Sequence, residues 1–481
     1  MSASKSAWRI SVAVVFCLAG LTVPAGVAEV IGAAGEPADA GRGHDRPLEP
    51  PEAPGFIERL PLTNPNISTM SPTPASALSI RDGYWLASGN DMYKLSPQGN
   101  VLAHKVYPYH YYSSLLFISA MAQWNEDSIY ALVSNTNATF LPSAMVRMNG
   151  AGEVEGHWNL DAFMASNSTI LANDNYIAFL DSVPAYYLIL IDTDFQNARK
   201  IAHTKALTLA MDDDEKIWVG TTGQDRYSIE SQILRLDTDK LSWEGIVFRP
   251  LVEEDRPEHH GYIQEVVPLP GGGWVVAGLM GYFKESNPWD LRWKYYSYLA
   301  EIGADGTVVW AQLFEDLNLV GLKRDAAGGL WGFGNALING NGIEAQLVIR
   351  FTTTGEPLWA VERQETYYFD DIRSGQAALT PEGGLALAWT TQFYKELWFG
   401  VLDPSRPLEG CDTFRSFDLT GRWLGPVTIE TRPAEVQAVE LDPVAIWEEP
   451  IELWEGEGEI IEWCPLRPLT RRGVRLSPLI R

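Results

Sequence analysis

The sequence predicts an all-β fold, specifically a seven-bladed β-propeller with a short C-terminal appendage. A unit of tight turns and short apolar strands recurs seven times along the chain, and such recurrence is typical of propellers. The 18 Trp, 19 Tyr and 17 Phe favour strands, while 42 Gly and 30 Pro separate them with turns. A chain of 481 residues is long enough for one such ring, or for two or three ordinary domains.

Residues 1–28 are predicted to be a secretory signal peptide. Lys5 and Arg9 make its start positive, and the apolar run from Ile10 to Leu21 is short for a membrane span. Ala28 ends a small-residue cleavage sequence, although a membrane anchor remains the alternative. Residues 29–54 are rich in Pro, Ala and Gly and are expected to form a leader. These features predict a secreted or periplasmic protein with no membrane contact after cleavage.

Residues 55–411 are predicted to form the propeller. Each repeat begins with a tight turn that leads into an apolar strand, and a second turn follows further on. Gly, Asn and Asp dominate these turns, as hairpins with positive φ require. Successive repeats are about as long as a four-stranded blade, which needs about 40 to 50 residues. The first turns begin at Asp82, Asp127, Asp174, Asp214, Gly272, Gly328 and Gly383.

The repeats could instead build a stack of β-sandwich domains. A closed ring is favoured because no linkers separate the repeats and because closure removes exposed sheet edges. The last repeat is expected to lack a regular outer strand, since Pro404 and Pro407 cannot donate ladder hydrogen bonds. We therefore expect Phe56 to Leu62, or part of 412–463, to complete this blade.

The repeats resemble those of bacterial secreted β-propellers of the delta-sixty and quinoprotein-like kind. Gly303-Ala-Asp305-Gly306-Thr-Val-Val-Trp310 and Thr354-Gly355-Glu-Pro-Leu-Trp359 match the end of that repeat pattern. The segment from Leu209 to Thr221 is similar to repeats of sensor and lactonase propellers. The similarity covers roughly residues 76–411 and implies a propeller fold. It implies no particular activity, since this architecture hosts many functions.

Residues 412–481 are predicted to be a β-rich appendage followed by a basic tail. From Trp447 to Trp463, Trp and Ile alternate with Glu, which suggests an exposed strand kept soluble by charge. Two cysteines remain after removal of the signal peptide, Cys411 and Cys464, and an even count in an exported chain predicts one disulfide. Two separate buried thiols are the alternative.

Charge and motifs exclude several functions. A formal net charge of −26 argues against binding to nucleic acid or to an anionic membrane surface. The chain has no Gly-x-Ser-x-Gly elbow, no His-Glu-x-x-His helix and no vicinal Cys pair. Glu258-His259-His260 could ligate a metal, but adjacent strand residues point to opposite faces, and Asp212-Asp213-Asp214 is better explained as an acidic turn. We therefore expect no metal and no cofactor.

The candidate ligand site follows from the connectivity of a blade. The first-to-second and third-to-fourth connections lie on one face of the ring, and all the tight turns belong to this class. The long connections should therefore gather on the opposite face, where binding residues commonly lie. They are rich in amphipathic rings suited to sugars or peptides, although these rings could instead pack locally. The predicted site residues are Tyr109, Tyr111, Tyr112, His259, His260, Trp289, Trp293, Tyr367, Tyr368, Asp370 and Asp371.

Together these observations predict a monomeric, non-catalytic binding or scaffold module. Its expected partner is an extracellular glycan or protein ligand, and no nucleic acid. The alternative function is a propeller hydrolase or lyase whose active site is assembled from scattered residues on the long-loop face.

Overall fold

The structure is a computed structural model of the full chain. It describes residues 56–63, 75–108, 116–125, 128–135, 143–161, 169–181, 187–202, 206–222, 230–237, 240, 242–252, 259–285, 291–338, 342–363, 377–390, 396–405, 408–409, 414–456, 460, 462–465 and 467–468. Residue contacts divide the chain into two compact units, Met1–Glu49 and Pro50–Arg481, and every described residue belongs to the second.

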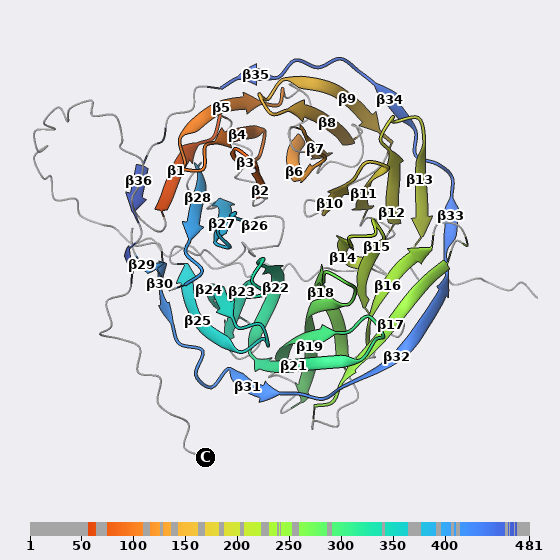
Figure 1. The fold of residues 1–481 in the computed structure, drawn as a ribbon, viewed down its shortest axis with the longest axis vertical. Helices are drawn as coiled ribbons and strands as arrows, with labels where there is room; N and C mark the ends of the chain where they lie inside the picture. Colours follow the sequence, from red (N-terminus) through yellow and green to blue (C-terminus); the bar gives the residue numbers. More distant parts are fainter. Residues whose placement is uncertain are drawn as a thin grey trace, which may run out of the picture. The chain divides into compact units, whose positions relative to one another are not determined.

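The regular structure of the described residues is entirely β-strand, as the sequence predicts. No helix in this part of the chain is long and apolar enough to cross a membrane. The strands form successive antiparallel meanders, and Figure 1 shows them following one another within the unit. This arrangement is that of a β-propeller-like all-β fold.

The first four meanders each contain four consecutive strands. The first comprises β2 (Ala75–Ile80), β3 (Gly83–Ser88), β4 (Asp91–Leu95) and β5 (Val101–Val106). The second comprises β6 (Leu116–Gln123), β7 (Ser128–Asn135), β8 (Ser143–Asn149) and β9 (Val154–Leu160). The third comprises β10 (Ile170–Ala172), β11 (Tyr176–Asp181), β12 (Tyr187–Asp192) and β13 (Ala198–Ala202). The fourth comprises β14 (Ala206–Met211), β15 (Ile217–Thr222), β16 (Ser231–Asp237) and β17 (Ser242–Pro250).

Two further meanders follow, and a single residue pair, Thr222 and Tyr262, joins the first of them to the fourth meander in one larger sheet. The fifth comprises β18 (His259–Pro268), β19 (Trp274–Glu285), β20 (Leu291–Ile302) and β21 (Val308–Glu315). The sixth comprises β22 (Leu317–Arg324), β23 (Leu330–Ile338), β24 (Gly342–Phe351) and β25 (Pro357–Arg363).

The last meander is completed by a strand from the other end of the sequence. It contains β26 (Ala377–Leu379), β27 (Leu385–Thr390) and β28 (Glu396–Leu402), and its fourth strand is β1 (Phe56–Pro61). Every residue of β1 pairs with β28, from Phe56 opposite Val401 to Pro61 opposite Glu396. The prediction that an outside segment completes this sheet is confirmed.

Tight glycine turns join the first to the second and the third to the fourth strands of most meanders. Gly99, Gly152, Gly306 and Gly355 all have positive φ values in third-to-fourth turns, which confirms the expected turn chemistry. Most connections at the other end of the meanders are longer. A notable exception is Asp316, which alone separates β21 from β22 and has a φ of 50°.

Apolar cores lie between neighbouring meanders. Among the described residues, seven such clusters occur, and each draws its side chains from two successive meanders. The cluster between the last and the first meander contains Phe399 and Tyr84, whose rings lie 5.1 Å apart. The circuit of cores is therefore closed, and each meander is buried on both faces.

The C-terminal segment adds an outermost strand to each meander. It visits them in reverse order, from the sixth back to the first and then the last, and every pairing is antiparallel. We call these strands the C-terminal belt, and Figure 1 shows it in blue at the outer side. The strands are β30 (Phe414–Phe417), β31 (Trp423–Pro426), β32 (Ile429–Gln437), β33 (Val439–Leu441), β34 (Ile446–Glu448), β35 (Trp454–Glu455) and β36 (Glu462–Pro465).

The belt also contributes apolar side chains to every one of the cores between meanders. They are Phe414, Leu419, Ile429, Ala438, Val444, Ile451 with Leu453, and Ile460. A final pair of short strands, β29 (Leu408–Glu409) and β37 (Arg467–Pro468), joins the segment before the belt to the segment after it. The described residues of the predicted appendage thus join the sheets of the body, because the outer strand of each meander offers a free edge.

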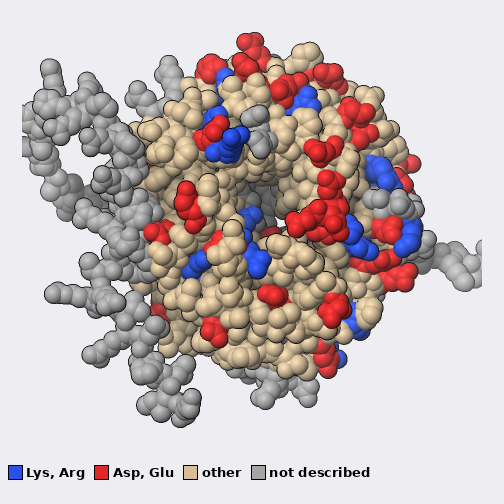
Figure 2. Space-filling view, viewed as in Figure 1, with Lys and Arg blue, Asp and Glu red and all other residues tan. Residues whose placement is uncertain are grey.

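Charge keeps the outermost edge soluble. Residues 438–465 contain nine Asp or Glu and no Lys or Arg, and like-charged edges resist pairing with other chains. Arg199 holds Glu440 through a pair of hydrogen bonds of 2.8 and 3.2 Å. Figure 2 shows Asp and Glu side chains spread widely over the visible face, and a hollow near its middle.

Candidate functional site: a cleft between two meanders and strand β32

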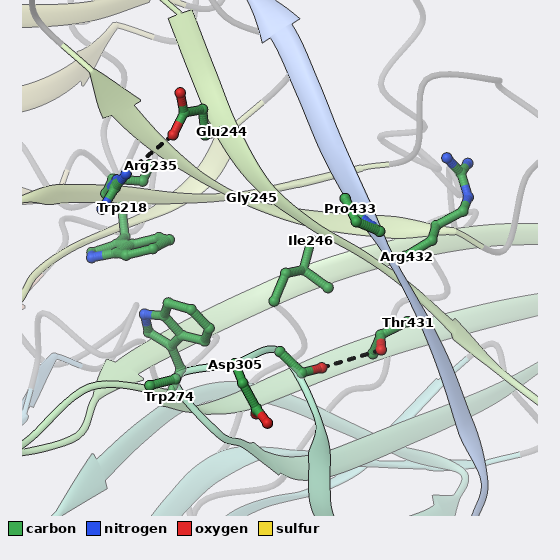
Figure 3. Close-up of a pocket in the computed structure, with 12 residues that line it drawn as sticks. Trp218, Arg235, Glu244, Gly245, Ile246, Trp274, Asp305, Thr431, Arg432 and Pro433 are labelled. Carbon is green, nitrogen blue, oxygen red and sulfur yellow. Dashed lines mark hydrogen bonds and ion pairs between the residues drawn. The ribbon is translucent and has the colours of Figure 1, made fainter.

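A cleft of about 340 Å³ lies where the fourth and fifth meanders meet the belt. Its walls come from β15, β16 and β17, from the start of β19, from the turn between β20 and β21, and from β32. In Figure 3 the indole rings of Trp218 and Trp274 lie close together beside Ile246, whereas the side chains of Glu244 and Arg432 point away from them. The lining residues are Trp218, Arg235, Glu244, Gly245, Ile246, Trp274, Ala304, Asp305, Gly306, Thr431, Arg432 and Pro433.

Trp218 is fixed by the turn that precedes its strand. Asp212 directly follows β14, the first strand of the meander, and one oxygen of its carboxylate accepts hydrogen bonds from the backbone N–H of Asp214 and Lys216. Its second oxygen accepts a 2.7 Å hydrogen bond from the indole N–H of Trp218. Asp214 pairs with Lys216 at 2.7 Å. The acidic run is therefore a structural turn that positions an aromatic wall of the cleft.

Two tryptophan rings form the apolar end of the cleft. Trp218 and Trp274 pack edge to face, with ring centroids 4.4 Å apart and planes at 63°. Both are largely buried, with exposed fractions of 7% and 6%, and both belong to the core between the two meanders. The guanidinium of Arg235 lies over the Trp218 ring at 5.7 Å from its centroid. The aromatic wall is therefore rigid before any ligand arrives.

The cleft is open because the fourth meander has a smaller side chain at a position where the sixth meander has tryptophan. In the sixth meander, Trp331, Arg350 and Trp359 stand opposite one another on three adjacent strands, and the two Trp rings pack 5.4 Å apart. In the fourth meander, the same row reads Trp218, Arg235 and Glu244. Glutamate is smaller than tryptophan, and the Glu244 carboxylate pairs with Arg235 and Lys240. The space beside Trp218 therefore stays open.

The charged groups around the cleft are already paired. Arg235 contacts Glu244 at 3.2 Å, and Lys240 contacts the other oxygen of Glu244 at 3.2 Å. On the belt, Arg432 pairs with Glu230 at 2.8 Å. These pairs are partly exposed, so each stabilises the fold only weakly. These ion pairs instead orient the guanidinium and carboxylate groups at the rim of the cleft.

The turn between β20 and β21 forms the floor near the belt. Gly306 has a φ of 83°, a conformation that favours glycine, and an added Cβ would lie 2.8 Å from Ile246 Cδ1. The hydroxyl of Thr431 in β32 donates a 3.1 Å hydrogen bond to the Gly306 carbonyl. Hydrogen bonds from Thr307 lower the pKa of Asp305 below its ordinary value, so its carboxylate is ionised at neutral pH.

The cleft lies at one end of the fifth meander, and the three described residues of the predicted site lie at the other end. His259 and His260 lie in β18 and Trp293 in β20, and their backbones pair with Tyr282, Gly281 and Phe283 of β19. Trp274 begins β19 at the other end, about 30 Å away for an extended strand. The remaining predicted site residues, Tyr109, Tyr111, Tyr112, Trp289, Tyr367, Tyr368, Asp370 and Asp371, lie outside the described residues.

The sequence interpretation did not place Trp218 or Trp274 in the site, and both are buried core residues. It missed their second role, because no local motif links them to Arg235, Glu244 or the belt residues Thr431 and Arg432. Aligning the repeats with one another could have revealed the cleft, because Glu244 occupies the position of Trp310 and Trp359 in later repeats. Among the described residues, no group of His, Cys, Asp and Glu side chains could hold a metal ion.

Comparisons with known proteins give only distant similarities. No family model matches the chain, and no curated protein is significantly similar to it in sequence. A DUF4221-family protein from Bacteroides vulgatus is 11% identical with a TM-score of 0.36, over 61% of this chain and 95% of that one. The Dos1 propeller is 10% identical with a TM-score of 0.32, over 72% and 95%. The polysaccharide lyase Uly1 is 8% identical with a TM-score of 0.30, over 70% and 100%. Since each TM-score lies below 0.5, these similarities establish neither fold nor activity.

Proposed function

We propose that the chain is a secreted or periplasmic seven-bladed β-propeller that acts as a monomeric, non-catalytic binding or scaffold module for an extracellular glycan or protein. In this proposal the seven meanders are the blades of one closed ring. The circuit of apolar cores supports this, because each core is shared by two successive meanders and the last is shared with the first. The signal-like residues 1–28 support export.

The cleft beside Trp218 and Trp274 is the observation that carries the binding function. Small-ligand sites are commonly concave, lined by aromatic and apolar side chains, and furnished with a few oriented polar groups. The cleft has this composition, with Ile246 and Pro433 beside the tryptophans and with Arg235 and Asp305 at the rim. Its volume of about 340 Å³ suits one small unit of a larger ligand.

The belt supports a role in which the ring stays rigid while a ligand is held. Strand β32 pairs with all nine residues of β17, from Ile429 opposite Pro250 to Gln437 opposite Ser242. It supplies one wall of the cleft and also places Ile429 in the core behind it. A preorganised wall lowers the ordering cost of binding.

The test is a binding screen on exported protein. The full chain is produced in a bacterial host with a secretion pathway, and the exported protein is applied to arrays of extracellular polysaccharides and of peptides. We expect saturable binding to members of one array, without release of smaller products. Absence of binding to both arrays would contradict the proposal, and release of products from a bound polysaccharide would favour the hydrolase or lyase alternative.

A further inference from the structure

The charged residues that line the cleft beside Trp218 and Trp274 indicate which ligand charge the cleft can accept. The ionised groups that line it are Arg235, Arg432, Glu244 and Asp305, so positive and negative charges are equal in number. Three of them are held in ion pairs, and Asp305 accepts two hydrogen bonds from Thr307. Both arginines are already paired, so an anionic ligand would lose hydration without gaining a free counter-charge.

The same groups retain capacity for neutral hydrogen-bonding partners. The pairs of Arg235 and Arg432 each use one of the five N–H donors that a guanidinium carries. Asp305 uses one carboxylate oxygen for both bonds from Thr307 and keeps the other for a further donor. Ligand hydroxyls can both donate and accept, so they match a rim that offers donors and acceptors together.

The walls between these polar groups are apolar. Trp218, Trp274, Ile246 and Pro433 present carbon surface to the cleft, and Figure 3 shows the two indole rings below Arg235 and beside Ile246. Aromatic and aliphatic walls bind the C–H face of a ring whose edge carries hydroxyls. This combination of an apolar wall with a charge-balanced polar rim fits a pyranose ring.

A peptide is a poorer match at this place. Extended peptides usually bind by adding a strand to a free sheet edge. The edge of β17 that borders the cleft is already occupied along its whole length by β32. A peptide strand would have to displace the belt, whose Ile429 is buried in the core beneath.

We propose that the cleft binds an uncharged sugar unit of an extracellular polysaccharide. This inference rests on the proposed binding function and narrows its ligand class. Asp305 and Arg235 bind hydroxyl groups of the sugar, and the Trp274 edge with Ile246 contacts its C–H face. Arg432 of the belt contacts the adjoining unit of the chain.

The experiment compares three probe classes on the intact protein by isothermal titration calorimetry: neutral oligosaccharides from mannan and glucan, uronate oligosaccharides from alginate, and sulfated oligosaccharides from heparin. We expect binding of a neutral oligosaccharide and at least tenfold weaker binding of the two anionic classes. Asp305→Asn should weaken the neutral ligand at least fivefold, because an amide replaces the ionised acceptor.

Asp418→Asn is the matched control. Asp418 is also an exposed turn carboxylate that accepts a hydrogen bond from the backbone N–H two residues later, and its pKa is also lowered, but it does not line the cleft. Asp418→Asn should leave the affinity unchanged.

If an anionic oligosaccharide binds more tightly and Asp305→Asn alters that binding, the ligand class is wrong while the binding function stands. If no sugar binds but a peptide does, the inference fails and the wider proposal survives. If neither sugars nor peptides bind, both fail.

Discussion

The carboxylate of Glu58 lies against Gly99, in the turn between β4 and β5: a Cβ added at Gly99 would lie 2.0 Å from Glu58 Oε1. Glu58 belongs to β1, the strand that completes the last meander, whereas Gly99 belongs to the first. The contact therefore lies at the seam of the circuit. Only 1% of Glu58 is exposed, and this burial raises the pKa of its carboxyl from 4.5 to about 8.

The raised pKa of Glu58 predicts a pH dependence of stability. Below pH 4.5 the carboxyl is protonated in both the folded and the unfolded chain, so its full contribution to stability is present. Between pH 4.5 and about 8 only the unfolded chain loses the proton, and the free energy of unfolding falls by about 1.4 kcal/mol per pH unit. We expect Glu58→Gln to remove this loss, which amounts to about 5 kcal/mol at pH 8.

Urea unfolding followed by tryptophan fluorescence at pH 5, 6.5 and 8 measures this effect. The exposed turn residue Glu356 provides the control, since Glu356→Gln should keep the pH profile of the parent protein. Parallel profiles for Glu58→Gln and the parent would contradict the assignment of a protonated Glu58.

Gly99→Ala should destabilise the protein by two separate effects. Its φ of 89° strains any residue with a Cβ, and the new methyl would also collide with Glu58 and Phe56. Gly421→Ala isolates the first effect, because Gly421 has a φ of 85° and nothing within 4 Å of an added Cβ. We expect a loss of about 1 kcal/mol for Gly421→Ala and about 1 to 3 kcal/mol more for Gly99→Ala. If urea unfolding shows equal losses of stability for Gly99→Ala and Gly421→Ala, the close contact between Gly99 and Glu58 would be contradicted.

The belt is predicted to be held by its buried side chains. Leu419 is buried in the core between the fifth and sixth meanders, whereas Leu424, five residues later, is 47% exposed. Leu419→Ala should lower the free energy of unfolding by about 2 kcal/mol or more, and Leu424→Ala by about 0.5 kcal/mol or less. Limited proteolysis should also cut the belt of the Leu419 variant faster. Similar cleavage rates for the two variants would mean that backbone pairing alone holds the belt.

The Cys411–Cys464 disulfide stays a prediction. Cys464 lies in β36, whereas Cys411 lies outside the described residues. The pairing of Glu409 with Arg467 brings the two flanking segments together, which favours the bond. Mass spectrometry of non-reduced tryptic digests should recover the two cysteines in one linked peptide. Two free, alkylated thiols would exclude the disulfide, whose closure is expected to stabilise the fold by about 4 kcal/mol.

Local signals in the sequence were enough to predict the strands. Turn residues such as Gly306 and Gly355 and the apolar runs that follow the first turns are short-range patterns, and the structure has strands at each of them. The weak end at Pro404 and Pro407 predicted that an outside segment, either Phe56 to Leu62 or part of 412–463, would complete the last meander, and β1 does so. These conclusions depend only on the backbone preferences of a few neighbouring residues.

The belt and the cleft could not be predicted in the same way. Most strands of the belt are short, and several are fully exposed, so they lack the alternation of a half-buried strand. Pairing of Ile429 with Pro250 joins residues far apart in sequence, and no local pattern encodes it. The cleft depends on Glu244 in place of a tryptophan, a difference visible only when the repeats are compared with one another.

The reverse order in which the belt meets the meanders sets a sequence of events for folding. The amino-terminal part of a chain is made first, so the belt emerges after every strand of the meanders. The belt can reach its partners only after all of them exist, and each of its pairings links residues of large sequence separation, which slows folding. A chain that stops at residue 413 would leave seven outer strands as bare templates for aggregation. The seven outer edges therefore stay unpaired until the residues that follow 413 have been made.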